Sequence, residues 1–478
     1  MQRRTKIVAT LGPSTDDPEI LRELIEAGLD VARFNFSHGN QDEQKERLLR
    51  LRQVAADCGR FVGVIGDLQG PKIRVRRFEN NSAKLKKGDN FFLDSALGEL
   101  DGNSDGVGVA YGNLHKDVAA GDILLLNDGQ MMLTVDRIDG TRIHTTVVLG
   151  GVLSDHKGIN REGGGLSAPA LTDKDRADIV FAAEMDMDYV AVSFVRSADD
   201  VRLARRLLEE AGGNGKVIAK IERVEALDCI DEIISAADAI MVARGDLGVE
   251  MGYAELTGMQ KHIIRRTRYM NKVVITATQM MESMIHSPIP TRAEVSDVAN
   301  AVMDGSDAVM LSAETAVGEY PVAVVEAMSN VCVGAEKHLL AKGRNSHRLD
   351  DRFREVDEAI AMAVMYTANH LDVKAIIALT ESGSTTLWMS RIRSDIPIYA
   401  FTPHDETSRR VTLYRGVYPI SFTIKTTDTR LLYRDIFATL LAHKIVEEGD
   451  RLIFTKGDLH GVSGSTNSMQ IVKVDSSI

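Results

Sequence analysis

Two short stretches place charged side chains at the ends of apolar runs. The triplet Lys220-Ile221-Glu222 closes the run VIAKIE, and the triplet Arg244-Gly245-Asp246 closes the run AIMVARGD. Charged groups that directly follow buried parallel strands face the open end of an α/β sheet or barrel, where a low-dielectric wall strengthens ionic contacts. One carboxylate from each stretch could hold Mg²⁺, with a lysine and an arginine alongside. This combination suits a phosphorylated, anionic substrate.

Polar residues follow most of the other apolar runs in the same way. If the runs form one eight-stranded barrel, six strands end in chemically useful residues: Arg33, Asn35 and Ser37 on the second, Asp67 on the third, Lys220 and Glu222 on the fifth, Asp246 on the sixth, Thr278 on the seventh, and Ser312 and Glu314 on the eighth. Any one of them could instead be a helix cap or part of a surface ion pair. Their common position favours one site built from several strands.

The framework that would position these residues is an alternation of strand-like and helix-like segments. Between residues 1 and 70, three β-rich runs alternate with helical patterns at 18–29 and 41–59. Between residues 168 and 345, five more strand-like runs alternate with amphipathic segments. Three strands and five strands make eight, so the sequence predicts an α/β fold, a (β/α)8 TIM barrel in two pieces.

The remaining segments predict two further domains. Residues 71–167 carry strand-like runs punctuated by Gly and Asp turns, with no clear helix, which predicts a small β-barrel domain inserted after the third strand as a lid. The glycines at 163–165 in its return segment predict a hinge. Residues 348–478 follow a polar stretch and predict a C-terminal open α/β domain.

Length and charge limit the class of protein. A chain of 478 residues exceeds what one hydrophobic core usually serves, so two or three domains are expected. The 57 Lys and Arg residues against 69 Asp and Glu residues give a net charge of -12, which argues against binding to nucleic acid or to an anionic membrane. Anionic small molecules must therefore be held by local basic pockets.

Cysteine usage and hydropathy predict a cytoplasmic protein. Cys58, Cys229 and Cys332 are odd in number and widely spaced, which fits a reducing compartment without disulfides or a zinc site. The apolar run near the first residues is too short for a signal peptide. No stretch approaches the roughly 20 apolar residues of a membrane helix.

Seven segments together carry a family resemblance. They are RFNFSHG (33–39), GDLQGPKIR (66–74), VIAKIERVEAL (217–227), MVARGDLGVE (241–250), ITATQMMESM (275–284), PTRAEVSDVANAV (290–302) and MLSAETAVGEYP (310–321). In these segments and their order, the chain resembles pyruvate kinase of the bacterial type over essentially its full length. The resemblance implies a glycolytic enzyme that transfers the phosphoryl group of phosphoenolpyruvate to ADP, giving pyruvate and ATP.

The resemblance also implies roles for particular residues. Glu222 and Asp246 match the family's Mg²⁺ ligands, where Mn²⁺ may substitute, and Lys220 matches the lysine that stabilises the transferring phosphoryl group. Arg33 matches a phosphate-binding position, and Thr278 matches the threonine implicated in proton delivery, with Ser312 and Glu314 as a supporting network. The backbone N–H groups of Gly245 and Asp246 could bind the substrate carboxylate, or they could belong to an ordinary helix cap. The nucleotide positions are Asn35, His38, Arg74 and Lys157.

One loop departs from the commoner pattern of the family. Many members need K⁺ and carry glutamate where this chain has Lys72, and their cation site also uses positions matching Asn35, Ser37 and Asp67. Leu68 resembles the K⁺-independent branch, and the Lys72 ammonium could supply the missing positive charge. The sequence therefore predicts activity without K⁺. The alternative is that Lys72 is a solvated loop lysine.

The C-terminal region resembles the family's effector and oligomerisation domain. Its expected pocket for a phosphorylated activator, either a sugar monophosphate or AMP, consists of Thr380, Ser382, Gly383, Ser384, Thr385, Thr386, Lys456 and Gly464. A capped helix beside a flexible loop would explain the same pattern. The resemblance also leads us to expect a homotetramer. Trp388, the single tryptophan, is expected in the core or an interface.

Two other classes of function remain open at this point. A Mg²⁺-dependent lyase of the aldolase type, acting on a pyruvate enolate, would explain Glu222 and Asp246 but gives no role to Lys220 or to the inserted domain. A metabolite-sensing protein with an inactive barrel is the non-enzymatic alternative. No G-x-x-x-x-G-K-[ST] motif occurs, so nucleotide phosphates would be held by side chains and metal.

Overall fold

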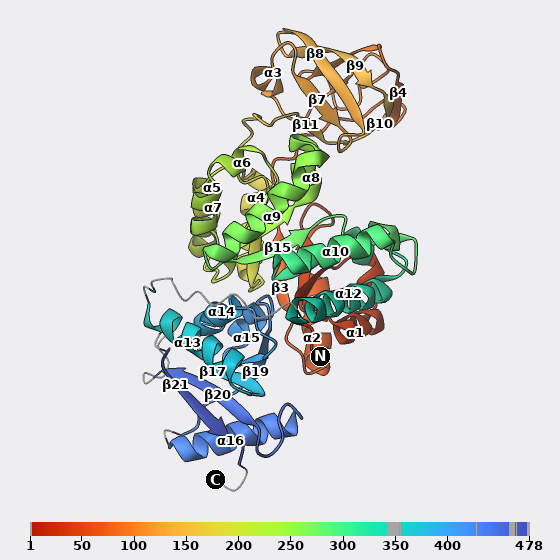
Figure 1. The fold of residues 1–478 in the computed structure, drawn as a ribbon. Helices are drawn as coiled ribbons and strands as arrows, with labels where there is room; N and C mark the ends of the chain where they lie inside the picture. The colour runs from red at the N-terminus through yellow and green to blue at the C-terminus, as the bar shows by residue number, and fades with distance from the viewer. Residues whose placement is uncertain are drawn as a thin grey trace.

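A computed structural model describes residues 2–341, 353, 355–426, 428–457, 464 and 466–475. Within these residues, eight parallel strands close into a barrel (Figure 1). They are β1 (Lys6–Thr10), β2 (Val31–Asn35), β3 (Gly63–Asp67), β12 (Tyr189–Val192), β13 (Lys216–Ile221), β14 (Ala239–Ala243), β15 (Val273–Ala277) and β16 (Ala308–Leu311). Three strands precede the insertion and five follow it, which confirms the predicted barrel.

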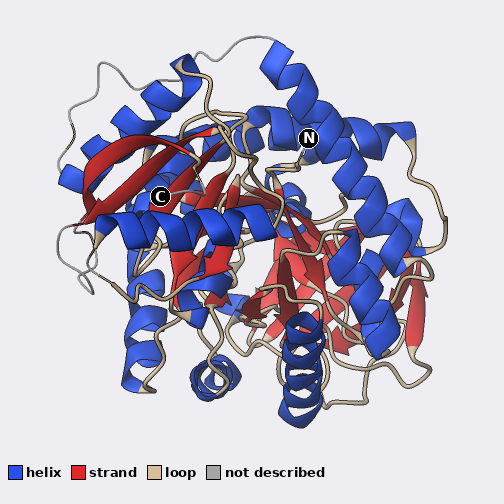
Figure 2. Ribbon diagram, turned by 90° about the horizontal axis from the view of Figure 1, so that it is seen from below, coloured by secondary structure: helices blue, strands red, loops and turns tan. Residues whose placement is uncertain are grey.

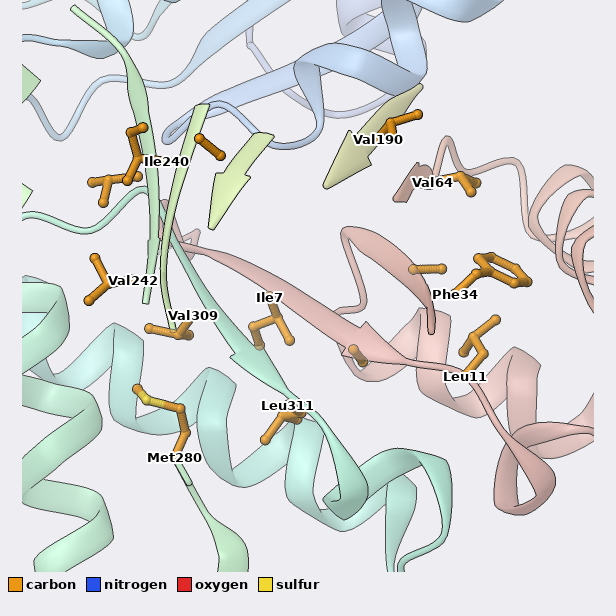
Figure 3. Close-up of a cluster of buried hydrophobic side chains, with 14 of the residues drawn as sticks. Ile7, Leu11, Phe34, Val64, Val190, Ile240, Val242, Met280, Val309 and Leu311 are labelled. Atoms are coloured by element: carbon orange, nitrogen blue, oxygen red, sulfur yellow. The ribbon is translucent and has the colours of Figure 1, made fainter. Parts of the chain in front are cut away.

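The barrel strands are buried on both faces, which is why their sequences are continuous apolar runs. Side chains such as Ile7, Phe34 and Val64 belong to one core that also contains residues of the surrounding helices (Figure 3). The long helices of this layer are α1 (Pro18–Ala27), α2 (Gln41–Asp57), α4 (Asp173–Glu184), α5 (Ala198–Glu210), α9 (Tyr253–Tyr269), α10 (Arg292–Asp304) and α12 (Pro321–Ala341). The helices expected at 18–29 and 41–59 are confirmed to within two residues at each end.

Two strands end earlier than the sequence suggested. The run AIMVARGD stops being a strand at Ala243, and Arg244 begins helix α8 (Arg244–Met251). Likewise β16 stops at Leu311, and the following residues form α11 (Ala313–Ala316). Gly245, Asp246 and Glu314 therefore lie on short helices that start at the rim of the barrel, not on its strands.

The insertion consists of two small sheets with their own core. One sheet has the order β11-β7-β8-β9-β5-β6, and the other pairs β10 with β4. Their bounds are β4 (Ser82–Leu85), β5 (Asn90–Asp94), β6 (Gly106–Gly108), β7 (Ile123–Leu126), β8 (Met131–Asp139), β9 (Arg142–Leu149), β10 (Gly151–Ser154) and β11 (Ile159–Arg161). A four-residue helix, α3 (Leu114–Asp117), also occurs where the sequence showed no clear helix. The insertion stands above the barrel, at the top of Figure 1.

The C-terminal region is an open sheet flanked by helices (Figure 2). The order is β19-β18-β17-β20-β21, with β17 (Ala375–Leu379), β18 (Ile398–Thr402), β19 (Val417–Ser421), β20 (Arg451–Gly457) and β21 (Thr466–Lys473). Its helices are α13 (Val356–His370), α14 (Ser384–Ser390), α15 (Asp405–Val411) and α16 (Thr429–Ala442). The antiparallel edge strand β21 was not predicted, whereas the other four strands were. Trp388 packs against the core of this region, as expected.

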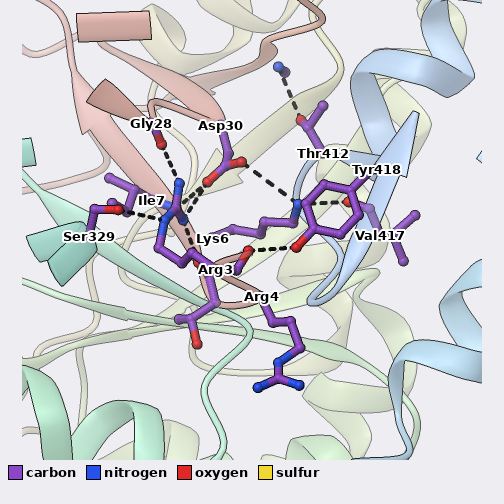
Figure 4. Close-up of polar contacts among 12 residues, drawn as sticks. Arg3, Arg4, Lys6, Ile7, Gly28, Asp30, Ser329, Thr412, Val417 and Tyr418 are labelled. Atoms are coloured by element: carbon purple, nitrogen blue, oxygen red, sulfur yellow. Dashed lines mark hydrogen bonds and ion pairs between the residues drawn. The ribbon is translucent and has the colours of Figure 1, made fainter. Parts of the chain in front are cut away.

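The C-terminal region contacts the end of the barrel opposite the predicted site. The Lys6 ammonium, at the start of β1, donates to the carbonyl of Val417 over 2.6 Å and lies 4.4 Å from the ring of Tyr418 (Figure 4). Arg391 forms a buried ion pair of 2.6 Å with Asp307, the residue before β16. No helix among the described residues is long and apolar enough to cross a membrane.

Candidate active site

A compact group of buried charges lies at the carboxyl ends of β2, β3 and β13. Asp67 is fully buried between two cations, because its carboxylate lies 2.6 Å from Nε of Arg33 and 3.1 Å from Nζ of Lys220. The Lys220 ammonium also lies 3.0 Å from Oε1 of Glu222. Two positive and two negative side chains thus occupy one low-dielectric space. The structure brings together four residues that the sequence placed on three separate strands.

These contacts determine which groups stay ionised. Burial alone would lower the pKa of Lys220, but the carboxylates of Asp67 and Glu222 outweigh it and raise that pKa above its ordinary value. Burial would likewise raise the pKa of Asp67, but Lys220 and Arg33 hold it below its usual range. The Lys220 ammonium therefore stays charged at the rim of the barrel.

Glu222 behaves differently from Asp67. Burial raises its pKa, the Asp246 carboxylate raises it further, and the Lys220 ammonium and the backbone N–H of Phe194 oppose these effects. Two carboxylates that repel one another in this way form a donor set for a divalent cation, because such an ion would neutralise both. Within the described residues no group of three or more His, Cys, Asp or Glu side chains could hold a metal. Glu222 and Asp246 would therefore leave the other coordination positions to substrate and water.

Lys72 is engaged and is not a free loop lysine. Its ammonium lies 3.0 Å from Oδ1 of Asp246 on the barrel and 3.4 Å from Oδ1 of Asp128 on the insertion. Burial would lower the pKa of Lys72, but these two carboxylates raise it. The lysine thus joins the base of the insertion to one of the two candidate metal ligands.

Thr278 adopts an unusual backbone at the end of β15. Its φ is 70°, in the left-handed region that a β-branched residue rarely visits, and strain of this kind clusters at functional sites. Its hydroxyl accepts from the N–H of Gly245 over 2.8 Å and donates to the carbonyl of Ala277 over 2.6 Å. The strained conformation therefore links the end of β15 to the start of α8. The Gly245 N–H would have to leave this hydroxyl in order to bind a substrate carboxylate.

Ser312 and Glu314 brace the neighbouring loops. Glu314 is almost fully buried and accepts from the N–H of Ser312 over 2.6 Å and from the N–H of Met281 over 3.3 Å. These backbone contacts join the loop after β16 to the loop that follows Thr278. Both residues thus position the rim of the barrel.

Sequence reasoning missed Ser193 and Thr10, which complete the site. The Ser193 hydroxyl, just after β12, accepts from Nζ of Lys220 over 2.7 Å and donates to the carbonyl of Leu68 over 2.7 Å. The Thr10 hydroxyl, at the end of β1, accepts from Nη1 of Arg33 over 2.9 Å. Thr10 and Ser193 lie at the carboxyl ends of the first and fourth barrel strands, for which the sequence analysis named no site residue. Both could have been predicted, because each is a polar residue at the end of an apolar run.

The remaining predicted nucleotide and cation positions lie in two places, the turn after β2 and the base of the insertion. Asn35, Ser37 and His38 form the turn after β2, where the Asn35 side chain accepts from the Ser37 N–H over 3.1 Å. Arg74 and Lys157 are neighbours at the base of the insertion, where Arg74 donates to the carbonyl of His156 over 2.8 Å. Within the described residues, neither forms a hydrogen bond or an ion pair with the Lys220 group.

A separate pocket in the C-terminal region gathers most of the predicted effector residues. Polar residues and apolar side chains line it together: Thr380, Ser382, Ser384, Thr385, Lys456 and Gly464 with Phe401, Pro403, Phe422 and Ile424. Gly383 and Thr386 lie behind it, where the Thr386 hydroxyl donates to the Gly383 carbonyl over 2.7 Å. Residues 461–463 and 465 of the predicted loop lie outside the described residues.

The fold and the site define a (β/α)8 barrel whose rim carries buried basic side chains paired with carboxylates. Comparison with family models matches residues 2–325 to the pyruvate kinase barrel domain and residues 358–472 to the pyruvate kinase alpha/beta domain. The chain is 52% identical over 477 residues to pyruvate kinase II of Salmonella typhimurium, and the match covers 99% of each chain. It is 51% identical to a pyruvate kinase of Buchnera aphidicola and 41% identical to one of Mycobacterium tuberculosis, again over 99% of each chain. The chain belongs to the pyruvate kinase family and is a phosphotransferase.

Proposed function

We propose that this chain transfers the phosphoryl group of phosphoenolpyruvate to ADP, giving pyruvate and ATP in cytoplasmic glycolysis. The observation that carries the proposal is the ammonium of Lys220, fixed between Asp67 and Glu222 at the rim of the barrel. A buried side chain that is already charged and fixed in place stabilises the negative charge on a transferring phosphoryl group, because the site does not have to reorganise during the reaction. No observation favours the lyase or the sensor alternative.

We infer that Glu222 and Asp246 hold Mg²⁺, or Mn²⁺ in its place. When bound, the ion would neutralise phosphate and enolate oxygens. Arg33 and Lys220 bind the phosphoryl group from the protein side, and Ser193 orients the lysine. The Thr278 hydroxyl contacts the N–H of Gly245 at the start of α8. Because a threonine hydroxyl is a poor acid alone, Thr278 would return a proton to the enolate as part of a relay.

The insertion, residues 71–167, acts in this proposal as a lid over the barrel formed by 1–70 and 168–345. Arg74 and Lys157 on the lid, with Asn35 and His38 on the rim, would hold the nucleotide phosphates. Closure about the glycines at 163–165 would exclude water that could intercept the phosphoryl group. The C-terminal residues 348–478 would bind the sugar monophosphate or AMP and build the homotetramer.

The direct test of this function is product stoichiometry. Purified protein is incubated with phosphoenolpyruvate, ADP and Mg²⁺, and pyruvate and ATP are both quantified. Equal amounts of the two products are expected. Pyruvate without ATP, or no ADP-dependent turnover from folded protein with sugar phosphates and AMP added, would overturn the proposal.

We also propose that the enzyme does not need K⁺. The position of Lys72, 3.0 Å from Asp246, supports a role for its ammonium as a fixed cation at the site. The variant Lys72→Glu is therefore expected to become K⁺-dependent, with at least about tenfold activation by K⁺ over Na⁺-free buffer. Activity of the original chain that rises strongly with K⁺ would contradict the proposal.

A further inference from the structure

Glu250 is a buried carboxylate next to the site and has no role in the chemistry above. It lies near the end of α8, the helix that begins at Arg244, and its exposed fraction is 3%. Oε1 accepts from Nδ2 of Asn160 over 3.3 Å, and Oε2 accepts from the backbone N–H of Val224 over 3.2 Å. Its main-chain carbonyl accepts from the N–H of Gly163 over 3.0 Å.

The three donors to Glu250 come from functionally different places. Asn160 belongs to β11, the last strand of the insertion, and Gly163 begins the glycine segment that returns to the barrel. Val224 follows the candidate metal ligand Glu222 by two residues. The helix that carries Glu250 also carries Asp246 in its first turn. One side chain thus joins the insertion to the elements of both candidate metal ligands, where α8 and β11 meet in Figure 1.

The same turn after β13 holds the rest of the return segment. The N–H of Gly165 donates to the carboxylate of Glu225, and Nη1 of Arg223 donates to the carbonyl of Leu166 over 2.7 Å. Gly164 has a φ of 79°, and a Cβ there would lie 2.8 Å from Oε2 of Glu225, so a larger residue would be strained and would displace this carboxylate. The return segment is therefore attached to the barrel at several points, whereas β11 is attached through Glu250.

We propose that Glu250 is a positioning residue that sets the pivot of the inserted domain relative to the Glu222 and Asp246 carboxylates. This inference rests on the proposed function, because it assumes that the insertion closes over bound ADP. Glu250 itself touches neither substrate. Its effect on turnover acts through Asn160, Val224 and Gly163.

The two hydrogen bonds from Asn160 and Val224 to the Glu250 carboxylate form a bridge between β11 and the turn after β13. This bridge needs an acceptor at both carboxylate oxygens. An ionised carboxylate accepts at both oxygens, but a protonated one turns one oxygen into a donor that faces an N–H group. Burial, helped by the Glu225 carboxylate, raises the pKa of Glu250 to about 7, although the Val224 N–H, Arg223 and Asn160 act in the opposite direction. Arg223 and Glu225 face it from the turn after β13, and the neutral amide of Asn160 faces it from β11. The bridge is therefore complete above about pH 7 and weakens below it.

An exchange of partners tests the bridge. In Glu250→Met the side chain has no oxygen, so both the Asn160 amide and the Val224 N–H lose their buried acceptor. In the double variant Glu250→Gln with Asn160→Asp, the glutamine amide can donate to the new aspartate while its oxygen still accepts from Val224. Net charge is unchanged in the double variant, and side-chain volumes are nearly so.

The measurements are kcat/KM for ADP, KM for phosphoenolpyruvate and hydrogen exchange of residues 160–167. For Glu250→Met we expect kcat/KM for ADP to fall about tenfold, KM for phosphoenolpyruvate to stay within about twofold, and hydrogen exchange to accelerate. The double variant is expected to recover most of the loss. The original chain is expected to lose kcat/KM for ADP below about pH 7, and Glu250→Met, which has no carboxylate at this position, is expected to lack that fall.

The outcomes separate this inference from the proposed function. If the original chain makes no ATP, the function fails whatever the variants do. If the original chain is active and Glu250→Met matches it, or if the double variant stays as impaired as Glu250→Met, Glu250 does not act through Asn160 and the inference is wrong.

Discussion

At the scale of single residues, the site combines a buried, charged lysine, Lys220, with a strained backbone conformation at Thr278. Asp67 and Glu222 raise the pKa of Lys220 above its ordinary value, and Thr278 is kept in a left-handed conformation by the loops around it. A conformation of this kind costs about 1–3 kcal/mol in a β-branched residue. The cost persists where the side chain is needed, which supports a chemical role for the Thr278 hydroxyl.

Replacement of Thr278 by glycine should separate stability from activity. Glycine adopts φ near 70° without strain. The free energy of unfolding of Thr278→Gly is therefore expected to equal that of the original chain or to exceed it by up to about 1 kcal/mol. Loss of the hydroxyl is expected to lower the turnover number by at least about tenfold. Urea unfolding and steady-state kinetics measure the two quantities. A variant that is both destabilised and fully active would contradict the role given to Thr278.

Most of these residues could be predicted because they share a position, not because they share a motif. The carboxyl ends of parallel strands meet at one rim, so apolar runs followed by a polar residue identified Arg33, Asp67, Lys220 and Glu222. What could not be read was how the residues pair. The contact of Lys72 with Asp246 crosses from the insertion to the barrel, and no local pattern encodes a contact over 174 residues.

At the scale of elements, the return segment of the insertion depends on glycine. Gly163, Gly164 and Gly165 all have φ between 76° and 91°, and a Cβ on Gly165 would lie 2.3 Å from Nη1 of Arg161. Arg161 in turn donates to the carbonyl of Gly164 over 3.2 Å. The segment therefore has a defined shape that alanine would disturb.

A substitution at this segment can be compared with one at an equally left-handed but open turn. Gly165→Ala is expected to lower kcat/KM for ADP by about tenfold, because Arg161 must move and the pivot moves with it. Gly121 has a φ of 96°, and nothing lies within 4 Å of a Cβ at this position. Gly121→Ala therefore introduces backbone strain without a clash between side chains. Equal kinetic losses in the two variants would show that the shape of the return segment is immaterial.

Element boundaries were the weakest part of the sequence interpretation. The barrel strands read clearly because both faces are buried, whereas β21 escaped because it is a half-exposed edge strand with the sequence TNSMQIVK and little alternation. The strand predicted over AIMVARGD was too long because a charged residue after an apolar run fits either a strand end or a helix start. Only the backbone decides between them.

At the scale of the whole molecule, buried ion pairs join the C-terminal region to the base of the barrel. Arg409 on α15 lies 3.0 Å from Asp188, whose carboxylate also accepts from the N–H of Val64 on β3 over 2.9 Å. Together with the ion pair between Arg391 and Asp307, these contacts connect the C-terminal region directly to the barrel strands that carry the site. A ligand that moved the C-terminal region would therefore act on the end of the barrel opposite the site.

Asp188 makes this junction sensitive to pH. Burial raises its pKa to about 6, although Arg409 opposes the shift. Because the folded pKa exceeds the unfolded value, the folded state binds more protons between about pH 4 and pH 6, and stability falls as pH rises through that window. Relative to Asp188→Asn, the original chain should therefore lose stability between pH 4 and pH 6. Urea midpoints across this range measure the difference, and parallel curves would show that Asp188 does not titrate there.

The central claim is that Lys220, fixed between Asp67 and Glu222, carries phosphoryl transfer. The most direct measurement compares ATP formation from phosphoenolpyruvate and ADP by the original chain, by Lys220→Met and by Lys87→Met, an exposed lysine of the insertion. The account predicts that Lys220→Met loses at least about a thousandfold in turnover while remaining folded, and that Lys87→Met stays within about twofold of the original chain. A Lys220→Met protein that still forms ATP at more than about a tenth of the original rate would contradict it.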